Sequence, residues 1–166
     1  LASLALGHCA GLPMSSMLDT LRTFRGLPHR CELVAEIGGV RFVNDSKGTN
    51  VGATIAAVEG TAGTLVVIAG GDGKGQAFDA LRPAFQGKVR HAVLIGRDAP
   101  RLAAALEGVC AIERADDMRA AVAAARAAAR PGETVLLSPA CASLDMYRDY
   151  AHRGEEFAAA VRSLAG

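Results

Sequence analysis

The sequence lacks an excess of charge of either sign. Its 18 basic side chains nearly balance 17 acidic ones, which leaves a formal net charge of +1. Nucleic acids and anionic membranes attract surfaces with a marked basic excess, so the composition argues against both kinds of partner. The length of 166 residues is enough for one domain that buries its own core.

Paired cysteines are also missing. Cys9, Cys31, Cys110 and Cys141 are far apart, and none belongs to a C-x-x-C pair. This spacing is typical neither of a zinc site nor of a small disulfide-linked domain. We therefore expect no metal to be bound by this chain, and a reducing, cytoplasmic environment.

An uncharged stretch at residues 1–18 does not have the character of a membrane span. Gly7, Gly11 and Pro13 interrupt it and no basic segment precedes it, whereas a span needs roughly 20 apolar residues. We expect a soluble helix that ends near Gly11. Because the chain starts with Leu1 in the middle of this helical pattern, we also expect it to be a piece of a longer protein.

The rest of the chain alternates apolar runs with amphipathic ones at the spacing of β-α units. Gly38 and Gly39 separate the first two runs and suit a tight hairpin turn, since glycine accepts positive φ. These patterns predict an α/β fold with an N-terminal β-hairpin and a mostly parallel sheet that carries helices on both faces. Strands are expected at residues 31–37, 40–44, 64–69, 91–95, 109–112 and 134–137, and helices at 54–59, 77–85, 99–106, 117–130 and 148–164.

Polar segments follow three of the predicted strands. They read N-D-S-K-G-T-N at 44–50, G-G-D-G-K-G at 70–75 and S-P-A-C-A-S-L-D at 138–145. A fourth strand is followed only by G-R-D, at 96–98. Ligands of such sheets collect beyond the carboxyl ends of the strands, so these segments predict a polar site.

Two lysines give this site a chemical preference. A carboxylate about 4 Å from a lysine gains roughly 4 kcal/mol of Coulomb energy at an effective dielectric near 20, so Lys47 and Lys74 could together hold an acidic small molecule. Thr49 and Ser143 could add hydroxyl donors, and Asp45 could face a ribose, an amine or a metal. In the alternative, both lysines are solvated and Asp45 caps the helix that begins around residue 50.

Two further features are less specific. The glycine-rich segment is neither G-x-x-x-x-G-K-[ST] nor a G-x-G-x-x-G that opens a helix, so a plain glycine-rich turn explains it as well as a phosphate cradle does. Cys141 could be a thiolate nucleophile, but small buried cysteines are commoner. Arg30 is of more interest, since a guanidinium can clamp phosphate with two hydrogen bonds.

Taken together, the motifs resemble a known family. G-L-P-H-R at 26–30, the three strand-end segments and H-R-G-E-E-F at 152–157 are similar, in order and spacing, to the C-terminal domain of the Mur ligases over about residues 26–166. The S-P-A-C-A-S-L-D segment favours the members that add D-glutamate. The resemblance implies a Rossmann-like domain at 26–166 that binds the amino acid and closes over the nucleotide. Residues 1–25 would then be the last helix of a truncated central ATP-binding domain, plus a connector.

The resemblance also implies an activity. Such ligases add D-glutamate to UDP-N-acetylmuramoyl-L-alanine through an acyl phosphate, during bacterial peptidoglycan synthesis in the cytoplasm. ATP and Mg²⁺ would be bound mainly by the central domain, so this chain would hold no catalytic residue and be inactive alone, as part of a monomeric enzyme. Another Mur or folylpolyglutamate-type ligase, or a stand-alone nucleotide-binding module, remains as an alternative.

Roles for single residues follow from the same resemblance. Arg30 and Asp45 would contact the nucleotide. The family usually has alanine where this chain has Gly48, which we expect to loosen the turn, and phenylalanine where it has Tyr150. The D-glutamate site would comprise Lys47, Thr49, Lys74, Ser143, Leu144 through its backbone, and Tyr150.

Overall fold

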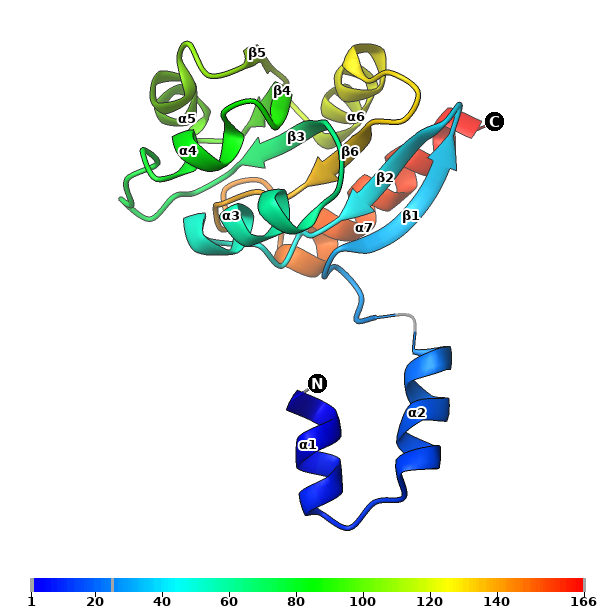
Figure 1. The fold of residues 1–166 in the computed structure, drawn as a ribbon. Coiled ribbons are helices and arrows are strands. Elements are labelled where there is room, and N and C mark those ends of the chain that lie inside the picture. The colour runs from blue at the N-terminus through cyan, green and yellow to red at the C-terminus, as the bar shows by residue number, and fades with distance from the viewer. Residues whose placement is uncertain (1, 25, 166) are drawn as a thin grey trace.

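The computed structural model describes residues 2–24 and 26–165 of the chain. The predicted start of a helix at Leu1 and the predicted domain boundary at residue 25 therefore lie outside the described residues. Two short helices come first, α1 (Ala2–Cys9) and α2 (Met14–Thr23). The helix predicted to end near Gly11 is α1, whereas α2 was not predicted. Figure 1 shows this pair of helices beside an α/β body.

The body is built on one six-stranded sheet in the order β1-β2-β6-β3-β4-β5. Only β1 and β2 are antiparallel; they form the predicted hairpin, with φ of +58° at Gly38 and +73° at Gly39. The other four neighbouring pairs are parallel, as the alternation of elements predicts. The strands are β1 (Glu32–Ile37), β2 (Val40–Asn44), β3 (Leu65–Gly70), β4 (Val89–Ile95), β5 (Ala111–Arg114) and β6 (Thr134–Leu137).

Alternate residues of the central strands feed two separate cores. In β3, Leu65 and Val67 point to one core while Val66 and Ile68 point to the other, which is the period of two that a strand requires. Helices cover both faces, as predicted (Figure 1). The first core contacts α3 (Val51–Gly60), α4 (Leu81–Phe85) and α5 (Ala99–Leu106), and the second contacts α6 (Met118–Ala128) and α7 (Tyr150–Arg162), which a short 3₁₀ turn follows at Ser163–Ala165.

Some predicted boundaries are wrong. The strand predicted at 109–112 lies at Ala111–Arg114, because β5 is an edge strand with no fully buried residue to mark its position. The helix predicted at 77–85 is only Leu81–Phe85, since a turn closed by the Phe78 carbonyl precedes it. Helix α7 begins at Tyr150 because Asp149 accepts a hydrogen bond from the His152 amide and so caps it.

The connections explain where a site can form. Strand β6 lies between β2 and β3. The helices that follow β2 and β3 pack on one face of the sheet, whereas the helix that follows β6 packs on the other face. Loops that diverge to opposite faces leave a crevice at the carboxyl ends of the strands. The three polar segments therefore meet at the carboxyl ends of these three neighbouring strands.

The two-sided core gives a direct test of the packing. Leu94 is fully buried in β4, so Leu94→Ala should lower the free energy of unfolding by about 2–5 kcal/mol, the usual effect of truncating a buried leucine. The measurement is urea unfolding of this chain. Leu33→Ala is the matched control, because Leu33 is 59% exposed, and it should change stability by less than about 0.5 kcal/mol. Equal losses in the two variants would contradict the packing.

Candidate functional site

Backbone hydrogen bonds connect the loops that follow β2, β6 and β3. The Asp45 amide donates to the Leu137 carbonyl at 2.8 Å, and the Ala140 amide donates to the Gly48 carbonyl at 2.9 Å. The Gly70 amide donates to the Pro139 carbonyl at 2.9 Å. The β6 loop thus lies between the other two and is bonded to both.

Lys47 lies against an aromatic wall. Its Nζ is 3.8 Å from the centre of the Tyr150 ring, a distance at which a ring face attracts a cation. His29 packs edge-on against the same ring at 6.2 Å, and its carbonyl accepts the Lys47 amide at 3.0 Å. Gly154 leaves room for this histidine, because a Cβ there would be 2.3 Å from His29 Nδ1. The structure thus brings the predicted residues Lys47 and Tyr150 together.

A buried arginine fixes this corner from inside. Arg153 is fully buried; it donates from Nε to Ser46 Oγ at 3.0 Å, from Nη2 to the Ser46 carbonyl at 2.8 Å and from Nη1 to the Cys141 carbonyl at 3.1 Å. Burial lowers the pKa of Arg153 to about 10, so it stays protonated at neutral pH. Ser46 Oγ in turn donates to the Tyr150 carbonyl at 2.7 Å. The sequence pattern gave no indication of this role.

The predicted nucleotide-binding residues share a second part of the site. Arg30, Asp45 and Lys47 line one hollow of about 320 Å³. Arg30 is exposed, while Asp45 Oδ2 accepts a hydrogen bond from Ser138 Oγ at 2.8 Å and Oδ1 accepts one from the Cys31 amide at 3.3 Å. The idea that Asp45 caps the next helix is wrong.

The cap of that helix is Asn50, whose side chain accepts the Ala53 amide at 2.9 Å. The Asp45 side chain instead connects the ends of β2 and β6 through its hydrogen bond with Ser138. Burial raises the pKa of Asp45 above its ordinary value, and hydrogen bonds from Ser138 and Cys31 offset part of this rise. Burial and the nearby Asp45 charge also raise the pKa of the Cys31 thiol to about 11.

The turn at Gly48, where the family usually has alanine, is closely packed. A Cβ at Gly48 would lie 2.6 Å from Asp45 Oδ2 and 2.9 Å from Ser138 Oγ. Glycine therefore leaves room for the hydrogen bond between these two side chains, and alanine would require the carboxylate to move.

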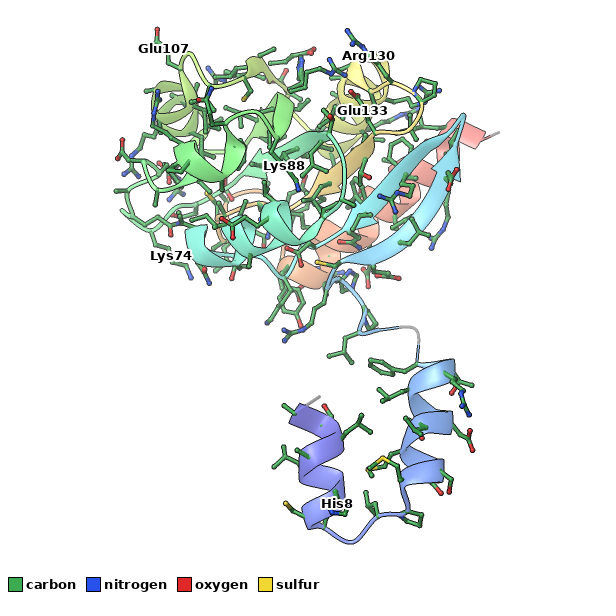
Figure 2. All side chains as sticks on the ribbon, viewed as in Figure 1. His8, Lys74, Lys88, Glu107, Arg130 and Glu133 are labelled. Carbon is green, nitrogen blue, oxygen red and sulfur yellow. The ribbon has the colours of Figure 1, made fainter. Side chains whose placement is uncertain are left out.

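The glycine-rich loop carries Lys74 at the edge of the molecule (Figure 2). Lys74 is exposed and has φ of +52°, an uncommon conformation for a residue with a side chain. Asp72 Oδ1 accepts its amide at 2.9 Å. Asp72 also forms an isolated antiparallel bridge with Ala142, through amides that donate at 3.0 and 2.8 Å. This bridge places the loops of Lys74 and Ser143 side by side.

The remaining predicted residues differ in exposure. Ser143 is buried, and its carbonyl accepts the amides of Met146 and Tyr147 in a tight turn. Leu144 is 70% exposed, so most of its side chain is open to solvent. Thr49 is half-buried next to Lys47, whose carbonyl accepts its amide at 2.8 Å. Within the described residues, neither the Ser143 nor the Thr49 hydroxyl has a hydrogen-bond partner, which leaves both able to bind a ligand.

Cys141 is a packing residue. It is fully buried, and burial raises the pKa of its thiol to about 12, which confirms the expectation of a small buried cysteine. Among residues 2–24 and 26–165, no three His, Cys, Asp or Glu side chains gather as they would around a metal ion. No helix in the same ranges is long and apolar enough to cross a membrane.

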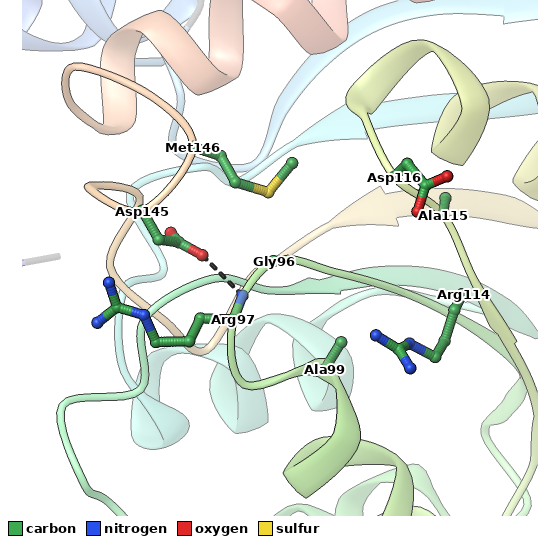
Figure 3. Close-up of a pocket in the computed structure, with 8 residues that line it drawn as sticks. All are labelled: Gly96, Arg97, Ala99, Arg114, Ala115, Asp116, Asp145 and Met146. Atoms are coloured by element: carbon green, nitrogen blue, oxygen red, sulfur yellow. Dashed lines mark hydrogen bonds between the residues drawn. The ribbon is translucent and has the colours of Figure 1, made fainter.

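The G-R-D segment at residues 96–98 also borders the site. Its Arg97 amide donates to Asp145 Oδ2 at 2.8 Å, beside a hollow of about 350 Å³ at the ends of β4 and β5 (Figure 3). Its polar partners are backbone groups and side chains far away in the sequence, so no local pattern could have revealed them.

Fold and site together define a Rossmann-like α/β domain with two ammonium groups at the carboxyl edge of its sheet. The pattern of the Mur ligase glutamate ligase domain matches residues 29–141, more than half of the chain. The chain therefore belongs to the Mur ligase family, which confirms the resemblance seen in its motifs.

Several relatives match along nearly the whole chain. It is 55% identical over 165 residues to the UDP-N-acetylmuramoylalanine--D-glutamate ligase of Methylococcus capsulatus. It is 58% identical over 167 residues to the protein of the same name from Aromatoleum aromaticum. Both matches cover 99% of this chain and 36% of the relative, so the chain spans about a third of the length of these relatives.

Solved structures share the fold at low sequence identity. UDP-N-acetylmuramate-alanine ligase MurC of Thermotoga maritima matches with a TM-score of 0.65 and 14% identity, over 97% of this chain and 36% of that one. MurF ligase of Thermotoga maritima, in complex with ADP, matches with a TM-score of 0.62 and 16% identity, over 98% and 38%. These likenesses support the architecture alone.

The role of Arg153 can be measured as stability. Arg153→Lys replaces three directed donors with a point charge that cannot reach all three acceptors. It should lower the free energy of unfolding by about 2–4 kcal/mol, since buried acceptors lose charge-assisted hydrogen bonds. Urea unfolding of the chain at neutral pH gives the value. Arg162→Lys, on the exposed end of the same helix, is the control and should be nearly neutral; similar losses in both would rule out the special role.

Asp45 should make stability depend on pH in an unusual direction. Because its pKa is raised in the folded chain, the native state binds the proton more tightly than the unfolded state does. The wild type should therefore lose stability as pH rises from about 3.9, the ordinary value, through the raised pKa. Asp45→Asn lacks this loss, so its stability relative to wild type should increase across that window.

Asp98 is the control, because its pKa is shifted in the opposite direction from that of Asp45. The pKa of Asp98 is lowered, mainly by the hydrogen bond from the Gly73 amide. The stability that Asp98 contributes is present above its ordinary pKa and is lost as pH falls, so Asp98→Asn should lose stability relative to wild type as pH rises. Urea unfolding between pH 3 and 7 measures both differences. The same sign in both variants would contradict the assignment for Asp45.

Proposed function

We propose that this chain is the part of a D-glutamate-adding Mur ligase that holds the incoming amino acid and closes over the nucleotide. The supporting observation is the bridge between Asp72 and Ala142, which sets the Lys74 loop beside the Ser143 loop, while the Lys47 turn bonds to the other side of the β6 loop. Two ammonium groups on one edge suit the two carboxylates of a dicarboxylic amino acid. Relatives over 50% identical are named as D-glutamate ligases.

In this proposal each polar group has one task. Lys47 and Thr49 hold one carboxylate of D-glutamate, and Lys74 holds the other. Ser143 and the Leu144 backbone complete the pocket. The ring of Tyr150 forms a wall and keeps Lys47 in place, since the cation already lies 3.8 Å above it. Positioning the amine in this way favours its attack on an activated carboxyl group.

The nucleotide side of the proposal uses Arg30 and Asp45, which line one hollow. Lys47 borders the same hollow but is assigned to the amino acid. The exposed Arg30 suits phosphate oxygens, and Asp45 is placed to meet a ribose hydroxyl group. Structural neighbours in complex with ADP, among them MurF of Thermotoga maritima, support ATP as the energy source. We assign the P-loop, Mg²⁺ and most contacts with UDP-N-acetylmuramoyl-L-alanine to parts of the ligase outside this chain. The acyl phosphate would form there.

The helical pair at the start of the chain fits the same scheme. Among its exposed apolar side chains are Leu6, Leu18, Leu21 and Phe24, and groups of exposed apolar side chains commonly mark surfaces that contact another domain. We assign residues 1–25 to the end of the preceding ATP-binding domain and its connector, and 26–166 to the amino-acid-binding domain. The whole enzyme would act as a monomer in the bacterial cytoplasm, with no nucleic-acid partner.

Replacement of Lys47 tests the proposal in the intact ligase. Lys47→Ala should raise the KM for D-glutamate about 10-fold or more while the KM for ATP changes about twofold or less, because one charge-assisted contact to the amino acid is lost. Steady-state kinetics with each substrate varied in turn measures the split. Lys88→Ala, at the amino-terminal end of β4 and thus at the far edge of the sheet, is the matched control. A larger effect on ATP than on D-glutamate would move Lys47 to the nucleotide and refute the assignment.

A further inference from the structure

The turn Gly96-Arg97-Asp98 follows β4 and contacts both loops of the proposed amino-acid pocket. Asp98 is the N-cap residue directly before α5, a position where an aspartate usually caps its own helix. Here its side chain makes no capping bond. Its Oδ2 instead accepts the Gly73 amide at 2.6 Å, and its own amide donates to the Gly71 carbonyl at 3.0 Å. Asp98 therefore holds the glycine-rich loop on both sides of Asp72.

Other aspartates of this chain behave differently at the same position. Asp117 accepts the Ala120 amide at 2.7 Å and Asp149 accepts the His152 amide at 2.8 Å, each capping its own helix. The carboxylate of Asp98 forgoes this bond for a residue 25 positions earlier. Its contact with Gly73 is thus a departure from what the local sequence favours.

Arg97 connects the same turn to the second loop. Its amide donates to Asp145 Oδ2 at 2.8 Å, two residues beyond Ser143 (Figure 3). Its guanidinium reaches Asp72 Oδ2 at 3.2 Å. Gly96 allows the close approach, because a Cβ there would lie 2.5 Å from Asp145 Oδ2 and 2.8 Å from the Gly71 Cα.

The glycine-rich loop needs such a restraint. Gly70, Gly71, Gly73 and Gly75 give this segment more conformational freedom than any other residue type would. Lys74 nevertheless has φ of +52°, a conformation that persists only where surrounding contacts enforce it. Because the Lys74 side chain is exposed, the direction in which its ammonium points depends on the loop backbone.

We propose that Asp98, assisted by Arg97, is a positioning residue that sets the Lys74 loop against the Ser143 loop for binding of the dicarboxylic amino acid. This inference rests on the proposed function, since it assumes that Lys74 binds D-glutamate. Asp98 restrains the loop more strongly than Arg97 does, because Asp98 is buried and its Oδ1 also accepts a hydrogen bond from Arg101 at 3.2 Å. The Arg97–Asp72 pair is weaker, because the Arg97 side chain is 65% exposed.

The test uses the intact ligase and kinetics with each substrate varied. Asp98→Ala should raise the KM for D-glutamate about 10-fold, with the KM for ATP and the kcat at saturating D-glutamate changed about threefold or less, since Gly73 loses a charge-assisted acceptor. Asp98→Asn keeps an oxygen that can accept the Gly73 amide and should recover much of the wild-type value. Arg97→Ala should raise the same KM by about two- to fourfold.

Asp117→Ala is the matched control for a purely structural role. It also removes an aspartate carboxylate that accepts a backbone amide at a helix start, but on the opposite face of the sheet from α5. It should lower the melting temperature and leave both KM values unchanged. If Asp98→Ala likewise lowers only the melting temperature, or raises both KM values equally, the inference is overturned.

Lys74→Ala separates this inference from the proposed function. An increase in the D-glutamate KM with Lys74→Ala but not with Asp98→Ala refutes the positioning role alone. No increase with Lys74→Ala refutes the proposed pocket and the inference with it. Should Asp98→Ala fail to fold, Arg97→Ala decides: a D-glutamate-specific increase supports the role, and none overturns it.

Discussion

The geometry of the site depends on one buried guanidinium. Arg153 has no carboxylate partner among the described residues, and its charge is met by hydroxyl and carbonyl oxygens of Ser46 and Cys141. An isolated buried charge is costly unless its donors are satisfied, so these acceptors are held at fixed positions. Ser46 precedes Lys47, and Cys141 lies two residues before Ser143. The spacing of the loops that carry Lys47 and Ser143 is therefore set by a contact inside the core.

The two halves of the proposed amino-acid pocket are held in different ways. On the β2 side, Lys47 is held through its amide by His29, which packs against Gly154 of α7, and through its cation by Tyr150, the first residue of α7. On the β3 side, the exposed Lys74 stands on a glycine-rich loop, and the carboxylates of Asp72 and Asp98 accept hydrogen bonds from the backbone of this loop. Side-chain packing gives rigidity on the first side, and hydrogen bonding to the backbone gives it on the second.

Much of this could be read from the sequence because the relevant signals are local. The hairpin at Gly38-Gly39, the buried strands and the three polar strand ends each occupy a continuous segment with its own pattern. The edge strand β5 was misplaced because its exposed residues carry no burial signal. Arg153 was missed because an arginine in an amphipathic helix is ordinarily solvated, and its acceptors lie 12 and 107 positions away. Asp98 was missed for a similar reason, since it occupies a capping position but bonds elsewhere.

The turn at residues 44–50 borders both the proposed nucleotide hollow and the proposed amino-acid pocket. Its close packing couples the backbone positions on the two sides. Asp45 is bonded to the end of β6 through Ser138, and Gly48 leaves no room between them for another carbon. Lys47 lies between these two residues and lines the same hollow as Arg30. Since close-packed groups cannot be displaced singly without a cost, a shift of Asp45 would disturb the turn that carries Lys47. The order of polar residues in this turn thus couples the proposed nucleotide hollow to the proposed amino-acid pocket, and Lys47 borders both.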